Sequence, residues 1–180
     1  FRQIPTFGRA IRRFYRNVSE MKKFAARDFE DVIQCIWPVL EGLFPDPVLE
    51  RLVMDLCFSL AVWHGHGKLR LHTSSSISRF RTLTTDLCKL IRRFASETRS
   101  IKTLELDREA KSRKRRLQKH LLASNPTTTT PELPASVTAR LPKSFNPDTY
   151  KIHAIPDYPD AIRLFGSMES FSTHIVCSGS

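Results

Sequence analysis

Apolar residues recur every three to four positions along the chain up to Leu104, which is the spacing of one face of an α-helix. A first helix is predicted to begin at Asn17, a good N-cap, because Glu20 lies three residues further on and completes a capping-box pattern. The apolar pattern continues to Leu43. Pro38 lies inside it, and an interior proline removes a backbone hydrogen bond, so we expect a kink or break there.

A second helix is predicted to begin at Asp46 and Pro47, with the aspartate as cap and the proline at the first helical position. Its apolar face is wide, so this helix is expected to be central. Gly65 and Gly67 weaken its end, each by about 1 kcal/mol relative to alanine. The helix is still expected to continue toward Leu71.

A third helix should follow the hydroxyl-rich turn at 73–76, and its apolar stripe extends to Leu104. Beyond Leu106 the stripe almost stops. Residues 108–120 can be helical but have little apolar surface to bury, so we expect a projecting helix end or a disordered segment. Two short helices are predicted near the C-terminus, the first at Tyr150–Ile155 and the second with Pro159 near its first turn and Gly166 at its end.

The predicted fold class is mainly α, an irregular helical assembly of about three long helices with a short C-terminal helical segment. No convincing strand pattern is present. The run TTTTP and the other prolines near it favour a disordered linker. The expected divisions are a basic N-terminal arm (1–16), a helical core with a basic projecting end (17–122), a disordered linker (123–143) and a short C-terminal helical segment (144–180).

Charge changes this picture, because it is both large and unevenly distributed. Lysine and arginine number 29 against 18 acidic residues, a net charge of +11. Residues 1–25 and 108–122 each carry seven basic residues and one acidic residue, whereas residues 26–63 carry two basic and seven acidic ones. Segregated positive charge attracts polyanions, so DNA or another nucleic acid is the expected partner.

The sharpest basic cluster is the run KSRKRR and its neighbours. Such side chains neutralise phosphates and release counterions, and the same run can serve as a nuclear localisation signal. The alternative is a solvated helix end. The predicted nucleic-acid-binding residues are Arg108, Lys111, Arg113, Lys114, Arg115, Arg116 and Lys119. In the basic arm, Phe14 and Tyr15 either stack on bases or pack onto the core, and we favour packing.

Catalytic and metal-binding patterns are weak. His64, His66 and His72 suggest a metal site, but positions two apart on a helix face different directions. No phosphate-binding loop, nucleophile elbow or zinc-type Cys/His spacing occurs. We therefore expect no cofactor and no metal.

Two-metal phosphoryl transfer would need several convergent carboxylates. Asp28, Glu30 and Asp31 are predicted to be solvent-facing helix residues, and Asp46 a cap. The chain is therefore expected not to be an enzyme.

The cysteines at 35, 57, 88 and 177 are too few and too scattered for a secreted disulfide framework, so reduced thiols are expected. The first three lie in apolar helical patterns, where cysteine acts as a small hydrophobe. No apolar stretch approaches the roughly 20 residues of a membrane span, and no signal peptide is evident. The expected location is intracellular, with the nucleus as the destination if the basic run acts as a signal.

Two stretches carry a family resemblance. Residues 6–73, from TFGRAIRRFYRN to LAVWHGHGKLRLHT, form the first, and residues 145–173 form the second. The second contains TYK and HA, then D and Y, then IR and FG, and finally the ST pair. Together they resemble the C-terminal helical region of fungal transposon-encoded proteins, the Plavaka and Kyakuja–Dileera–Zisupton-like transposases of mushroom-forming fungi.

The resemblance implies a helical accessory region of a DNA-cutting and DNA-joining enzyme whose acidic RNase H-like core would lie upstream. No catalytic residue of that family falls on a position of this sequence. Because the chain begins with Phe1 rather than Met, we expect a fragment. The resulting hypothesis is a non-catalytic, transposase-derived helical protein that contacts nucleic acid. The alternative is a helical protein–protein interaction module that binds a protein partner through its helical faces.

Overall fold

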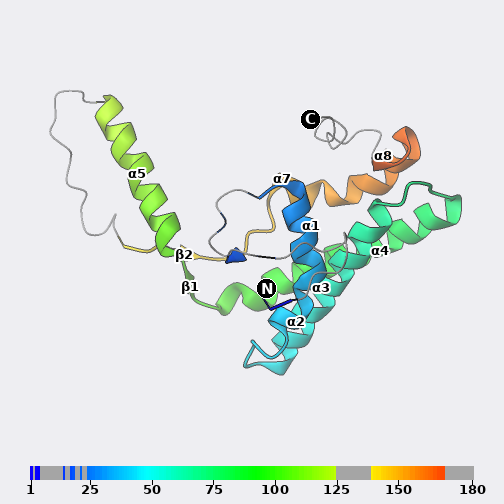
Figure 1. Cartoon of the computed structure of the whole chain (residues 1–180), viewed down its shortest axis with the longest axis horizontal. Coiled ribbons are helices and arrows are strands. Elements are labelled where there is room, and N and C mark those ends of the chain that lie inside the picture. Colours follow the sequence, from blue (N-terminus) through cyan, green and yellow to red (C-terminus); the bar gives the residue numbers. More distant parts are fainter. Residues whose placement is uncertain are drawn as a thin grey trace. The chain divides into compact units, whose positions relative to one another are not determined.

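The computed structural model describes residues 24–124 and 139–168, together with positions 1, 3, 4, 14, 17, 18 and 21. The protein is mainly α-helical, which confirms the predicted fold class (Figure 1). The chain divides into two compact units. We call residues 1–97 with 147–180 the helical unit, and residues 98–146 the insert unit.

The helical unit contains most of the secondary structure. Its elements are α1 (Ala26–Cys35), α2 (Trp37–Leu40), α3 (Pro47–Gly67), α4 (Ser74–Glu97), α7 (Tyr150–His153), the 3₁₀ segment η3 (Ile155–Asp157) and α8 (Tyr158–Phe165). The predicted break at Pro38 is confirmed, because α1 ends before it and α2 carries it in its first turn. The predicted start of α3 is also confirmed, since the Asp46 carboxylate accepts the Val48 N–H at 2.9 Å.

The predicted start of the first helix at Asn17 is wrong. Asn17 is not helical, and α1 begins at Ala26. The Ala25 backbone N–H donates to the Asp28 carboxylate at 2.8 Å, so Asp28 provides the reach-back contact expected of Glu20. Glu20 itself lies outside the described residues.

The predicted end of the third helix at Leu104 is also wrong. Helix α4 ends at Glu97 and is followed by the 3₁₀ turn η2 (Thr98–Ser100). Ile101 and Leu104 are 42% and 51% exposed, so extending the helix would bury no further apolar face. Most helical stability in proteins comes from such burial, so the helix stops where its packing stops.

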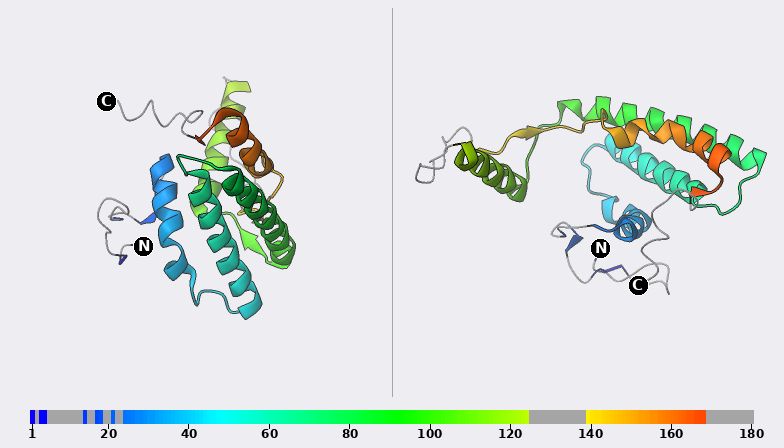
Figure 2. Two further views of the ribbon diagram at one scale, coloured as in Figure 1. Left: turned by 90° about the vertical axis from the view of Figure 1, so that its right-hand side faces the viewer. Right: turned by 90° about the horizontal axis from the view of Figure 1, so that it is seen from above.

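The core of the helical unit forms where α3, α4 and the C-terminal segment meet. In both views of Figure 2, the segment from α7 to α8 lies along α4, beside α3. The buried residues of this core are Trp63, Phe80, Leu87, Ile91, Ile155 and Ile162. Phe80 and Leu87 are fully buried and lie seven residues apart on the inner face of α4.

The two glycines of α3 differ in their surroundings. A Cβ added to Gly65 would meet nothing within 4 Å, whereas one added to Gly67 would lie 2.9 Å from Met168 Sδ. The absence of a side chain at Gly67 therefore lets Met168 pack against the end of α3. Both glycines are predicted to weaken the helix. Only at Gly67 does the missing side chain also have a packing role.

The insert unit contains α5 (Asp107–Ser124) and two short antiparallel strands, β1 (Thr103–Leu104) and β2 (Pro142–Lys143). Thr103 pairs with Lys143, and Leu104 pairs with Pro142. Residues 125–138 of the predicted linker lie outside the described residues. Of its described part, residues 123–124 belong to α5, and Pro142 and Lys143 pair with β1, which differs from the sequence expectation for those positions.

Candidate nucleic-acid interface

All seven predicted nucleic-acid-binding residues lie on α5. The helix begins where the Leu106 N–H donates to the Glu109 carboxylate at 3.0 Å, and Asp107 and Glu109 place negative charge in its first turn. Negative charge at a helix N-terminus is favourable because the helix dipole is positive there. This arrangement separates the acids at the start of α5 from the basic residues that follow.

Four of the seven basic residues share one face of α5. Arg108, Lys111, Arg115 and Lys119 are three or four residues apart, so they follow one side of the helix. All four are exposed. At 1.5 Å per residue, they cover roughly 16 Å of helix length. We call these four residues the α5 basic face.

Lys114 and Arg116 flank this face on its two sides. Lys114 is half-buried and, with Lys111 and Arg140, lines a shallow hollow beside Asp107. Arg116 is exposed. Both cations can add to the positive potential of α5, but they do not extend the line of the α5 basic face.

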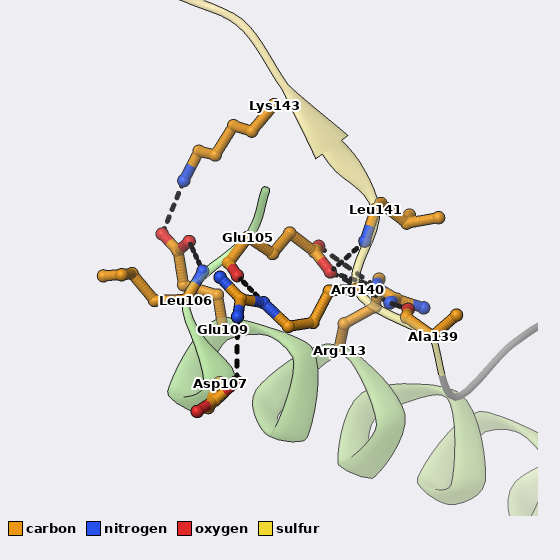
Figure 3. Close-up of polar contacts among 9 residues, drawn as sticks. All are labelled: Glu105, Leu106, Asp107, Glu109, Arg113, Ala139, Arg140, Leu141 and Lys143. Atoms are coloured by element: carbon orange, nitrogen blue, oxygen red, sulfur yellow. Dashed lines mark hydrogen bonds and ion pairs between the residues drawn. The ribbon is translucent and has the colours of Figure 1, made fainter. Parts of the chain in front are cut away.

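Arg113 has a different role, because its guanidinium is already bound within the insert unit (Figure 3). Its Nε donates to Glu105 Oε1 at 3.1 Å, and its terminal nitrogen donates to Glu105 Oε2 at 2.9 Å and to the Ala139 carbonyl at 2.7 Å. The side chains of Arg113 and Glu105 are 28% and 15% exposed. Arg113 therefore fastens α5 to the segment that leads into β2.

Glu105 is the centre of this contact. Its carboxylate also accepts the Leu141 N–H at 3.1 Å, and its own N–H donates to the Leu141 carbonyl at 2.9 Å. The hydrogen bonds from Arg113, and then that from Leu141, lower the pKa of the Glu105 carboxyl. Its ionised form is thus the form that the folded unit stabilises.

Further polar contacts join the same segments. The Lys143 ammonium donates to Glu109 at 2.5 Å, which lowers the pKa of the Glu109 carboxyl, and Arg140 lies 3.5 Å from Asp107. Figure 3 shows these side chains converging where α5 begins. Among residues 98–121, 123 and 139–146, none is buried, so ion pairs and hydrogen bonds hold these segments together in place of an apolar core.

Sequence reasoning found the basic residues of α5 but missed their division into two roles. Ala139, which binds Arg113, and Leu141, which binds Glu105, lie in the predicted linker, far from Arg113 in sequence. The only local signal was Glu105 just before the helix, an acid placed ahead of a basic run. The position of Glu105 in the sequence does not reveal which of the seven basic residues Glu105 binds.

The three histidines of the candidate metal site do not converge. His64 Nε2 lies 3.9 Å from Glu30, whereas the His66 ring contacts the Val62 carbonyl at 3.2 Å. Both lie on α3, and they face different directions because they are two residues apart. Within the described ranges, no group of three or more His, Cys, Asp or Glu side chains could hold a metal ion.

The acidic residues of the first helix each have a different structural role or environment. Asp28 caps α1, and Glu30 accepts a hydrogen bond from Lys68 at 2.8 Å. The prediction that Asp31 faces solvent is wrong, because it is only 3% exposed. Its position on the inner side of the amphipathic helix α1 explains the burial. Asp46 is a cap, as predicted.

No protein-family model, curated protein or solved structure matches the chain. The transposase resemblance therefore stays a prediction from the sequence. Among the described residues, no helix is both long and apolar enough to cross a membrane.

The described cysteines are free thiols with a structural environment. Cys35 is buried, and Cys57 and Cys88 are half-buried. Burial raises the pKa of all three thiols, which disfavours the thiolate needed for nucleophilic attack. These positions agree with the expected role as small hydrophobes. Cys177 lies outside the described residues.

Proposed function

We propose that the protein is a non-catalytic nucleic-acid-binding protein that contacts phosphates through the α5 basic face. The observation that carries this proposal is the alignment of Arg108, Lys111, Arg115 and Lys119 along one exposed side of a single helix. A double-stranded nucleic acid carries one negative charge per about 1.7 Å of its axis, so the length of this face corresponds to about ten phosphates.

The binding is expected to be electrostatic and weakly sequence-selective. Each phosphate neutralised by a lysine or arginine releases condensed counterions, so affinity falls as salt rises. The sequence contains no recognisable base-reading motif such as a helix-turn-helix. Phosphate contacts position a protein on the duplex without reading its sequence.

The proposed origin is a transposon-encoded protein of the fungal families named above, with the nucleus as the proposed location. The sequence pattern of residues 145–173 supports this origin. Within it, the IR and FG elements lie on α8 and at its end, where Gly166 has a φ of 87°. Glycine adopts this conformation without steric cost. The pattern thus includes a residue that a specific backbone turn requires.

A protein–protein interaction module is the second candidate, and exposed aromatic side chains favour it. Trp37 and Phe58 are 44% and 57% exposed, and their rings lie 5.8 Å apart. Leu43 and Val48 are more than 60% exposed. Clustered apolar surface often marks a protein contact. Such a complex would be largely insensitive to salt.

The deciding experiment is a fluorescence-anisotropy titration of a duplex DNA at several salt concentrations. Replacing Lys111, Arg115 and Lys119 by Gln should weaken binding by about tenfold or more near 100 mM salt and lower the salt slope by about 2.7. The control variant replaces Arg51, Lys151 and Arg163 by Gln, which removes three charges from exposed positions elsewhere. An unchanged affinity and slope in the α5 variant would exclude this face as the contact.

A further inference from the structure

Helix α4, in the helical unit, carries a second group of basic residues. Its exposed cations are Arg79, Arg81, Lys89, Arg92 and Arg93. The only acids in the helix are Asp86 and Glu97. From Arg79 to Arg93 these cations cover roughly 21 Å of helix length and are spread over the outer half of the helix. We call this group the α4 basic face.

The α4 basic face is directed away from the core. Phe80, Leu87 and Ile91 occupy the opposite side of the helix and are buried. A helix packed along its length on a core presents its outer side chains from a fixed backbone. The positive charges are therefore displayed on a rigid support, which reduces the conformational cost of binding.

The ion pairs on this face are exposed and exchangeable. Lys89 lies 3.2 Å from Asp86, and Arg81 binds Asp160 of α8, but all four side chains are roughly half exposed or more. Exposed pairs of this kind contribute little to stability. Among the described residues, no carboxylate pairs with Arg92 or Arg93. These two adjacent guanidinium groups, with Lys89 one turn before them, form the densest part of the face.

Among the positions between the cations, Thr82 and Thr85 are uncharged, and Asp86 is an exposed acid that pairs with Lys89. Thr82 and Thr85 donate their hydroxyl protons to the Ser78 and Arg81 carbonyls, at 3.3 and 3.1 Å. Their side chains therefore lie close to the helix and add no negative charge.

We propose that the α4 basic face is a second nucleic-acid contact, which binds the phosphate backbone of duplex DNA. This inference deepens the proposed function and rests on it. A group of exposed cations on the outer half of a helix, with no apolar centre, fits a phosphate backbone better than a protein surface, whose contact centres are depleted of charge. Because the α4 and α5 faces are covalently linked, the second contact forms at a raised effective concentration when both can reach one duplex.

The test compares five proteins in the same anisotropy titration: wild type, the α5 variant, an α4 variant, their combination, and the control variant. The α4 variant replaces Lys89, Arg92 and Arg93 by Gln. We expect its salt slope to fall by about 2.7, and that of the combination by about twice as much. The control variant at Arg51, Lys151 and Arg163 should keep nearly the wild-type slope, and circular dichroism should show unchanged helix content in every variant.

The outcomes separate this inference from the proposed function. If only the α5 variant lowers the slope, the α4 contact is wrong and the proposed function stands. A lower slope in the α4 variant alone would support the second contact and overturn the assignment to α5. If the control lowers the slope as much as the α4 variant does, total charge accounts for binding and the α4 contact is wrong.

Discussion

The indole N–H of Trp63 on α3 donates a hydrogen bond to Thr84 Oγ1 on α4, 3.0 Å away in the core. The same hydroxyl donates to the Phe80 carbonyl at 2.7 Å. A single buried hydroxyl thus satisfies the polar edge of the largest core side chain and links the two long helices. Buried polar groups are costly only when they lack such partners.

The first prediction concerns this hydroxyl. Replacing Thr84 by Val keeps the shape of the side chain but leaves the Trp63 N–H without its partner, so the helical unit should lose about 1–3 kcal/mol. Thr84→Ser keeps the hydroxyl and should cost less. Urea unfolding followed by tryptophan fluorescence measures both. Equal stability of the two variants would show that the hydrogen bond is unimportant.

The two glycines of α3 provide a second, matched prediction. Gly65→Ala should stabilise the helical unit by up to about 1 kcal/mol, because alanine favours the helix and the space is open. Gly67→Ala places a Cβ 2.9 Å from Met168 Sδ, so the methionine side chain must shift and this variant should be less stable than Gly65→Ala. Thermal unfolding measures the difference. Adding Met168→Ala should make the stability changes of the two glycine variants more similar. If it does not, the contact between position 67 and Met168 is contradicted.

A third prediction separates the two roles of basic residues on α5. Arg113→Gln removes the contacts to Glu105 and Ala139, so amide hydrogen exchange should accelerate at Leu141 and Glu105. Arg115→Gln removes the same charge from the exposed face and should leave that exchange unchanged. Site-resolved exchange by NMR measures both. Equal protection in the two variants would exclude Arg113 as the fastening residue.

The fourth prediction is a pH dependence of the insert unit. The pKa values of Glu105 and Glu109 are lowered in the folded state, so the unfolded state binds more protons in acid. The stabilisation is therefore fully present above the unfolded carboxyl pKa of about 4.3, and it is lost as pH falls through the folded values. The Leu141 amide resonance, followed by NMR during acidification, should report this loss. In Glu105→Gln that transition should be smaller.

Local signals in the sequence predicted helix boundaries correctly where a single residue determines the backbone conformation. Pro38 broke the first helix and Asp46 capped α3. Gly166 ended α8 as expected, in a conformation that glycine favours. Each of these effects acts within a few residues, so the sequence alone was enough to predict it.

The features that the sequence did not reveal depend on contacts between distant segments. The pairing of Thr103 with Lys143 joins positions on either side of α5, and neither strand is long enough to show a period. The burial of Asp31 and the binding of Arg113 likewise depend on what packs nearby. For the candidate site, composition identified the basic helix, but only the three-dimensional contacts distinguished its binding face from its fastening residue.

The order of synthesis has a consequence for the helical unit, because its core is assembled from two separated parts of the chain. Ile155 and Ile162 complete the apolar cluster that includes Phe80, Leu87 and Ile91 of α4. The ribosome makes the whole insert unit after α4 and before these two isoleucines. A nascent chain that has released α3 and α4 therefore exposes one apolar side of α4 to the cytosol until α8 emerges. This interval is when chaperones would bind and when aggregation would compete with folding.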